Sequence, residues 1–202
     1  MNQPYLTHCT AFAGTQRIAS GELAQVAVKA KAVWDRDQWA QVLIFDDVTS
    51  NLIEVDFRGS PEDVRRRISE AAAGAEPCSE TATPAGEARR PGRPRLGVVA
   101  REVTLLPRHW EWLAGQPGGA SVALRKLVEQ ARGANRGADR RRRAQEAAYR
   151  FLTAMAGNEP GYEEAIRALF AGNRERFDQM AAAWPVDVRD HAMKLAAVAF
   201  VE

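Results

Sequence analysis

The stretch that most constrains how this 202-residue chain can fold is its middle, from residue 75 to residue 97. It reads AEPCSETATPAGEARRPGRPRLG and has no apolar periodicity. Its prolines and glycines oppose a continuous helix, and its arginines oppose burial. We therefore predict an exposed linker over residues 75–97, with a first domain that ends near Gly74.

Residues 1–74 are predicted to form an α+β domain with the order ββαββα. Two strand-like runs meet at Gly14, and a helix capped by Ser20 should follow them. A second hairpin is predicted over residues 41–57, and the run SPED that begins at Ser60 indicates another helix start. The predicted buried face of the second hairpin consists of Leu43, Phe45, Ile53, Val55 and Phe57.

Residues 98–133 have the order strand, helix, turn, helix. The run VVAREVTL at 98–105 alternates like a short strand, and Pro107 should open a helix. The break GQPGGAS precedes a second helix that Ser121 is predicted to cap. The apolar stripe of this helix is Leu124, Leu127, Val128 and Ala131.

This order, with the strand running into LP and the segments WL, GGAS and LRKLV after it, resembles the ribbon-helix-helix family of bacterial DNA-binding proteins over roughly residues 97–132. A lone strand must find a partner for its backbone groups, which predicts a homodimer through paired strands. A two-stranded ribbon fits the major groove of double-stranded DNA. The predicted dimer core is Val103, Leu105, Trp110, Leu113, Leu124, Leu127 and Val128.

The resemblance also implies which residues contact DNA. The outward strand residues would be Ala100, Glu102 and Thr104, although a register shift of one residue would turn Arg101 outward instead. The backbone N–H groups at Gly119, Ala120 and Ser121 would bind a phosphate. The full predicted DNA-binding set is Arg93, Arg95, Arg101, Glu102, Thr104, Arg108, Gly119, Ala120 and Ser121.

The run RRPGRPRLG, immediately before the predicted strand, contains Gly-Arg-Pro. This tripeptide is similar to the core of the AT-hook, although Pro91 stands where that motif has arginine. Arg93 and Arg95 would then enter a narrow, A·T-rich minor groove. The alternative is a basic, stiff linker.

Residues 138–202 are predicted to form a small helical bundle, opened by the run DRRRR at 139–143. Those arginines could contact phosphates or be a solvated helix start. Over its whole length the chain resembles a bacterial domain-of-unknown-function family, number twenty-two thirty-nine. The residues that carry this resemblance are GRPRLGVVAREVTLLPRHWEWLAGQPGGASVALRKLVEQAR and RFLTAMAGNEPGYEEAIRALFAG.

The charge distribution favours a polyanionic partner. Residues 89–150 hold 15 Lys/Arg and 5 Asp/Glu, a net of +10, whereas the remainder holds 13 and 21, a net of −8. We find no catalytic constellation: Asp46 and Asp47, like His8 and Cys9, should point to opposite faces of a strand. We therefore expect no enzyme activity, cofactor, metal or membrane span.

These features together predict an α+β fold with an N-terminal ββαββα domain, a central ribbon-helix-helix and a C-terminal small helical bundle. We expect a cytoplasmic, nucleoid-associated protein that binds double-stranded DNA as a homodimer, either a transcriptional regulator or a nucleoid-associated protein. The alternative is a protein-interaction module, antitoxin-like or sensor-coupled, whose DNA binding serves autoregulation. A protein partner or small effector would bind its N-terminal or C-terminal domain.

Overall fold

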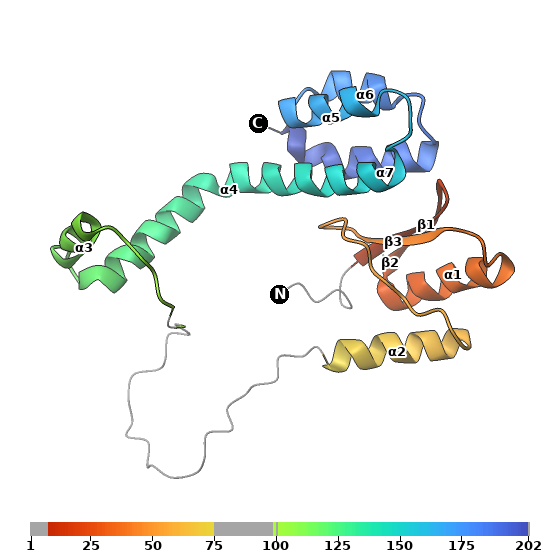
Figure 1. Ribbon diagram of the computed structural model, residues 1–202, viewed down its shortest axis with the longest axis horizontal. Coiled ribbons are helices and arrows are strands. Elements are labelled where there is room, and N and C mark those ends of the chain that lie inside the picture. Colours follow the sequence, from red (N-terminus) through yellow and green to blue (C-terminus); the bar gives the residue numbers. More distant parts are fainter. Residues whose placement is uncertain (1–7, 75–98, 100, 202) are drawn as a thin grey trace, which may run out of the picture. The chain divides into compact units, whose positions relative to one another are not determined.

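The computed structural model describes residues 8–74, 99 and 101–201, which combine helices with a small antiparallel sheet (Figure 1). Its fold is therefore α+β, as the sequence predicts. The chain divides into two units. Unit 1 contains the described residues of 1–77 and 137–202, and unit 2 contains those of 78–136. In the described part, no helix combines the length and the apolar composition that crossing a membrane requires.

The sheet of unit 1 has the strand order β2-β1-β3, in which β1 is His8–Ala13, β2 is Gln16–Glu22 and β3 is Val42–Asp46. The predicted hairpin around Gly14 is confirmed: β1 and β2 pair antiparallel, and Gly14 has a left-handed φ of 54°. β1 pairs antiparallel with β3 on its other side. The sheet is therefore centred on β1.

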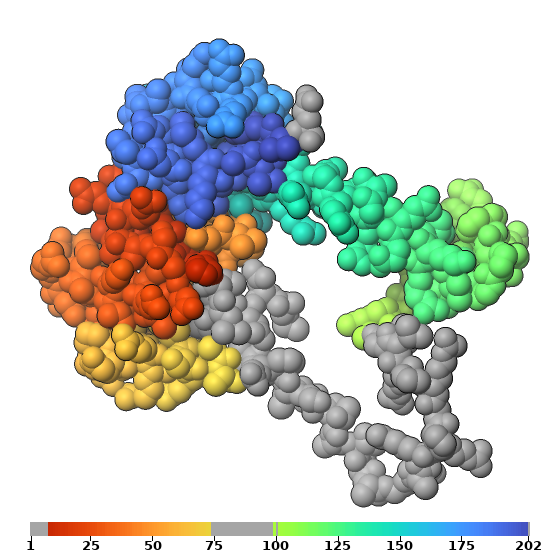
Figure 2. Space-filling view, turned by 180° about the vertical axis from the view of Figure 1, so that it is seen from behind, coloured from red at the N-terminus to blue at the C-terminus, as the bar shows by residue number. Residues whose placement is uncertain are grey.

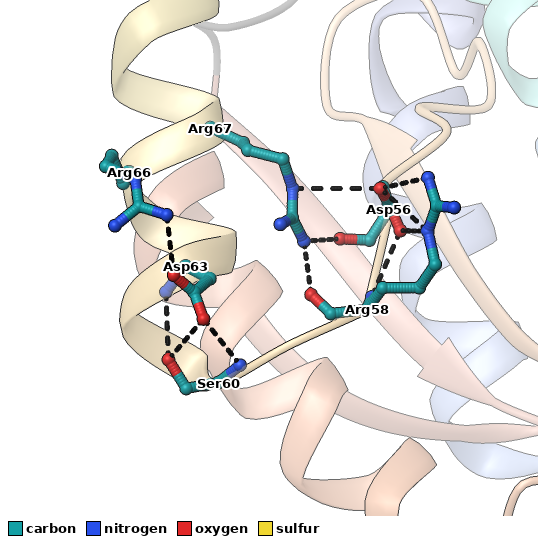
Figure 3. Close-up of polar contacts among 6 residues, drawn as sticks. All are labelled: Asp56, Arg58, Ser60, Asp63, Arg66 and Arg67. Carbon is teal, nitrogen blue, oxygen red and sulfur yellow. Dashed lines mark hydrogen bonds and ion pairs between the residues drawn. The ribbon is translucent and has the colours of Figure 1, made fainter.

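The predicted fourth strand is wrong. Only one bridge, between Phe45 and Leu52, continues the sheet, with the amide of Ile53 donating to the Ile44 carbonyl at 2.8 Å. Beyond it, Arg67 on α2 (Pro61–Gly74) donates through Nη2 to the carbonyl oxygens of Asp56 and Arg58, at 2.6 and 2.5 Å (Figure 3). Those backbone acceptors bond to a side chain instead of a strand, so the segment leaves the sheet.

The start of α2 agrees with its sequence signal. Pro61 is the first helical residue, and the amide of Asp63 donates to Ser60 Oγ at 3.2 Å. The amide and hydroxyl of Ser60 donate back to Asp63 Oδ2, at 3.0 and 2.8 Å (Figure 3). Reciprocal capping of this kind satisfies donors that a helix end otherwise leaves free.

The predicted cap of α1 (Leu23–Arg36) is wrong. Ser20 lies inside β2 opposite Thr10, and the two hydroxyls share a hydrogen bond of 2.9 Å. The N-cap is Glu22, which makes no side-chain capping bond. The cross-strand partner therefore holds Ser20 in the sheet, and the helix begins two residues later than the capping signal suggested.

Both faces of the sheet are buried. One face contributes Cys9, Ala11 and Ile44 to a core with residues of α1 and α2. The other contributes Phe12 and Phe45 to a core with residues 148–199. Figure 2 shows the N-terminal residues, in red and orange, meeting the C-terminal helices, in blue, along a continuous surface. Residues 1–74 and 138–202, which the sequence pattern separates, thus contribute to one hydrophobic core.

Helix α4 runs without interruption from Gly119 to Met155. The sequence pattern predicts that one domain ends at residue 133 and that a new helix starts with DRRRR after residue 138. Both predictions are wrong, because the helix is continuous. The segment contains two glycines but no proline, and a glycine costs only about 1 kcal/mol inside a helix. Fourteen consecutive residues, Arg125 to Ala138, are exposed, so none of their side chains is buried within the chain.

The remaining helices are α5 (Tyr162–Ala171), α6 (Arg174–Ala181), α7 (Val186–Ala196) and the short 3-10 helix η2 (Ala197–Phe200). Gly172 ends α5 with a φ of 70°, as its sequence position predicts. The side chain of Asn173 then caps α6 by accepting from the Arg176 amide at 2.9 Å. Pro185 precedes the first residue of α7 and is its N-cap.

Candidate nucleic-acid interface

Unit 2 contains two helices joined by a tight turn. Pro107 opens α3 (Pro107–Ala114), as predicted, and α4 begins five residues after α3 ends. Gly118 and Gly119 both have left-handed φ values, 85° and 75°, which reverse the chain direction at no steric cost. The turn therefore requires the GG pair of GQPGGAS.

Ser121 is not the cap of α4, contrary to the sequence expectation. The helix already begins at Gly119, whose amide donates to the Gln116 carbonyl at 3.0 Å. Ser121 lies in the first turn, where its own carbonyl accepts from Arg125 Nε at 3.1 Å. The left-handed glycines end the turn early, so the helix begins three residues before the position that a Ser121 cap would give.

The hydrophobic core of unit 2 is very small. Of its described residues, only Leu113 and Ala123 are buried hydrophobics. Seven of the fifteen large hydrophobic side chains that are exposed in the described chain lie between Val99 and Val128, with exposures from 41% to 74%. They are Val99, Val103, Leu106, Trp110, Trp112, Leu127 and Val128. A segment this short that exposes so much apolar surface is typical of an association surface.

The seven residues of the predicted dimer core fall into two groups in the single chain. Leu113 is buried, and Leu105 and Leu124 are half-buried. The other four, Val103, Trp110, Leu127 and Val128, are exposed. Their burial in a dimer stays a prediction.

The predicted strand has no partner among the described residues. Val99 and residues 101–105 are assigned no strand, and none of them forms a backbone hydrogen bond with another described residue. The first backbone bonds beyond this stretch run from the amides of His109 and Trp110 to the Leu106 carbonyl, at 2.8 and 3.3 Å. Strand pairing of this stretch with a second chain therefore stays a prediction.

The predicted DNA-contacting side chains that the structure describes face solvent. Arg101, Glu102, Thr104 and Arg108 are all exposed. At the start of α4, Ser121 is exposed, and Gly119 and Ala120 are half-buried. Arg93, Arg95 and Ala100 lie outside the described residues.

Several described cations of unit 2 form no ion pair with another described residue. Among the ion pairs of the described residues, Arg132 is paired with Glu129 at 2.7 Å, but Arg101, Arg108 and Arg136 are in none. Helix α4 as a whole carries nine Lys/Arg against three Asp/Glu, a net of +6. Arg125, Arg132 and Arg136, spaced at i, i+7 and i+11, share one face of this helix. This face is not among the predicted DNA-binding residues, although the helical spacing of its arginines is visible in the sequence.

A family model described as "Uncharacterized protein conserved in bacteria (DUF2239)" matches residues 8–196. The chain belongs to this family. The match includes the described residues of both units up to Ala196, so it supports the bacterial whole-chain resemblance found in the sequence. No curated protein and no solved structure matches the chain.

Two arginines of the run DRRRR in this DUF2239 chain are bonded to other groups of the chain. Arg141 Nη2 donates to the Val201 carbonyl at 3.0 Å, and Arg142 Nη2 lies 2.9 Å from Asp139 Oδ1. Arg140 and Arg143 are exposed and form no ion pair with a described residue. The run thus lies inside α4 and helps to hold the C-terminal end of the chain.

The polar groups that resemble catalytic residues in the sequence have structural contacts. Burial, together with the charges of Asp47 and Asp46, raises the pKa of the Cys9 thiol to about 12, which disfavours a nucleophilic thiolate. Asp46 accepts the amides of Val48 and Thr49 in the turn after β3, at 3.0 and 2.7 Å. Asp47 accepts the Thr10 hydroxyl at 2.6 Å. Each group therefore supports the fold.

Proposed function

We propose that this chain binds double-stranded DNA as a homodimer, with residues 98–133 as a ribbon-helix-helix and residues 89–97 as a basic, AT-hook-like arm. In this proposal the protein is a bacterial transcriptional regulator or a nucleoid-associated protein. The observation that carries the proposal is the concentration of exposed large apolar side chains between Val99 and Val128. Unit 2 buries too little surface to be stable without a further partner.

The exposed apolar area supports a second copy as that partner. At exposures of 41–74%, the seven side chains present roughly 600 Å² per chain, if complete large side chains expose about 150–250 Å² each. Two copies would bury about 1,200 Å², which reaches the lower limit of stable protein–protein interfaces. An antiparallel pair of residues 98–105 would add backbone hydrogen bonds to this area.

Charge and geometry support DNA as the ligand. Residues 89–136 hold ten Lys/Arg and three Asp/Glu, a net of +7 per chain, which a dimer doubles. Paired strands would place Arg101 or Thr104 at base edges, depending on register, because a β-ribbon fits the major groove. The first amides of α4 would meet a phosphate, since helix N-termini favour anions.

Sedimentation of the purified protein and duplex-binding anisotropy test the proposal together. A dimer is expected at micromolar concentration, and Val103→Glu should shift it towards monomer because it places a charge in the apolar core that the proposed dimer buries. Trp39→Ala is the matched control, because Trp39 is 95% exposed but lies in unit 1. Affinity for duplex DNA should fall steeply between ~50 and ~200 mM salt, with a slope of about 0.9 per phosphate contact.

A monomer, or duplex affinity that does not change with salt, would contradict the proposal. A dimer that does not bind DNA would favour the protein-interaction module instead.

A further inference from the structure

A pocket of about 340 Å³ lies in unit 1, between the turn that follows β3 and the last turns of α4. Its lining includes Phe45, Ser50, Leu52, Tyr149 and Arg150. The volume is within the range of about 300–1,000 Å³ that small-molecule sites occupy. None of these residues belongs to the proposed DNA-binding segment.

Ser50 is the unusual residue of this pocket. Its backbone has a left-handed φ of 54°, which a non-glycine residue rarely adopts. The side chain is only 2% exposed, and its Oγ has no hydrogen-bond partner among the described residues. The amide of Ser50, in contrast, donates to the Asp46 carbonyl at 2.8 Å. The turn is thus built from satisfied backbone groups and leaves one buried hydroxyl unsatisfied, which native proteins generally avoid.

A cation is bonded to the same turn. Arg150 Nη1 donates to the carbonyl of Thr49, the residue before Ser50, at 2.9 Å. Arg150 also forms an ion pair with Glu146, whose Oε2 is 3.8 Å from Arg150 Nη2, and about half of each side chain is exposed. A guanidinium has five N–H donors, so Arg150 keeps donors for a further anion, and it shares the pocket lining with Ser50.

The rest of the lining is apolar or already bonded. Phe45 is fully buried, and Leu52 and Tyr149 are about half exposed although they are large apolar groups. The Thr153 hydroxyl is occupied, because it donates to the Tyr149 carbonyl at 2.8 Å and is 2.9 Å from the Tyr162 hydroxyl. Most of the pocket lining is therefore hydrocarbon surface.

We infer that this pocket binds a small organic acid. Its carboxylate would accept hydrogen bonds from Arg150 and from the Ser50 hydroxyl, and its aromatic or branched hydrocarbon body would contact Phe45, Leu52 and Tyr149. A carboxylate is the anion whose geometry a guanidinium matches with two parallel hydrogen bonds. The inference does not depend on DNA binding.

The test is an NMR titration of the full-length, ¹⁵N-labelled protein with three probes. Benzoate supplies both the charge and the apolar body, benzyl alcohol supplies only the body, and acetate supplies only the charge. We expect benzoate to cause saturable shifts in the amides of residues 45–52 and 149–154. Each of the other two probes should bind at least about tenfold more weakly, a difference of about 1.4 kcal/mol.

Two variants and a control assign the contacts. Ser50→Gly removes the hydroxyl and suits the left-handed backbone, so the fold should be retained. Arg150→Gln removes the charge. Each should weaken benzoate binding by about tenfold, whereas Arg143→Gln, an exposed and unpaired arginine on the same helix, should not change it.

The inference would be overturned if benzoate caused no saturable shift at these amides. It would equally be overturned if both pocket variants bound benzoate as the unchanged protein does. Because the readout uses no DNA, its failure is distinguishable from failure of the proposed function.

Discussion

Mild acid should destabilise unit 1 through a single buried histidine, His191 on α7. The imidazole is 2% exposed and packs against the rings of Phe151 and Phe12, with centroid distances of 4.6 and 5.5 Å. Its Nε2 has no hydrogen-bond partner among the described residues. The pKa of His191 is lowered from its ordinary 6.5 to about 4, mainly by burial. The charge of Asp47 partly offsets this lowering, and the charges of Lys194 and Arg17 add to it.

The size of the effect follows from this pKa difference. The folded state binds fewer protons than the unfolded state between pH 6.5 and pH 4, so protonation favours unfolding in that window. A shift of 2.5 units, from 6.5 to about 4, corresponds to about 3 kcal/mol at about 1.4 kcal/mol per unit. This stability is present above pH 6.5 and is lost as the pH falls towards 4. About 2.5 kcal/mol of it should be lost by about pH 4.5.

Urea denaturation between pH 7.5 and pH 4.5 measures this loss. His191→Phe keeps an aromatic ring between Phe12 and Phe151 but cannot titrate, so its free energy of unfolding should change about 2.5 kcal/mol less over the window. His191→Met is a second, more adaptable replacement if the larger ring strains the core. The control is His109→Gln, because His109 is exposed on α3.

Asp63 should contribute little to the pH dependence measured in this assay. Hydrogen bonds from Ser60 lower its pKa to about 2, so most of its titration lies below pH 4.5. Equal pH dependence of the His191 variants and the unchanged protein would refute the reasoning. In that case the imidazole would be hydrated or hydrogen-bonded in solution.

Three further predictions test the fold and the arm. Arg67→Met should destabilise unit 1 by roughly 1–2 kcal/mol in urea denaturation, because it removes two hydrogen bonds to backbone carbonyls. The control is Arg65→Met on the same helix, which should leave the stability unchanged because Arg65 is exposed and forms no ion pair with a described residue. Gly133→Ala with Gly137→Ala should raise the helical circular dichroism signal, and each change should stabilise α4 by about 0.5–1 kcal/mol. An added Cβ meets no atom within 4 Å at either position. Unchanged helicity would contradict a continuous α4. Arg93→Ala with Arg95→Ala should weaken binding mainly to duplexes with A·T-rich flanks. Thr104→Ala should instead reduce the preference for particular central base pairs by about 1–3 kcal/mol. If the arm variant lost equal affinity for two probes that differ only in their flanks, the arm would be a non-specific linker.

Features that depend on neighbours in sequence were predictable. Pro61 and Pro107 each open a helix, and Gly172 ends one, because a fixed φ or a left-handed φ acts within a single turn. Gly14 marks its hairpin for the same reason. The two helices of residues 98–133 and the turn between them follow such signals, whereas the described residues of the predicted strand are assigned no strand.

Features that depend on distant residues were not predictable. The capping propensity of Ser20 is overridden by its cross-strand bond to Thr10, and the strand propensity of residues 51–57 is overridden by Arg67. Neither partner can be identified from sequence spacing. The pocket was missed in the same way, because about a hundred residues separate Ser50 from Arg150 along the chain.

The hydrophobic pattern also gives a wrong prediction for β3, because alternation predicts one buried face and the strand is buried on both. Alternation predicts that Phe45 points inward and Ile44 outward, yet both are buried, at 1% and 3% exposure. A strand buried on both faces needs a helical layer on each side, and α1 and α2 can cover only one. The second layer is supplied by residues from the other end of the chain.

The same argument applies to residues 98–133, with a different outcome. In unit 1 every large apolar side chain of the sheet has a partner within the chain, because residues 148–199 cover the second face. In unit 2 the described residues supply no such cover for Val103, Trp110, Leu127 and Val128. Apolar surface of this extent is unfavourable in water unless another molecule covers it. A second copy presents the same strand and the same stripes, and a two-fold axis pairs each with its equivalent. The homodimer that we propose would cover these apolar side chains and would give the backbone of Val99 and residues 101–105, which has no partner among the described residues, a strand to pair with.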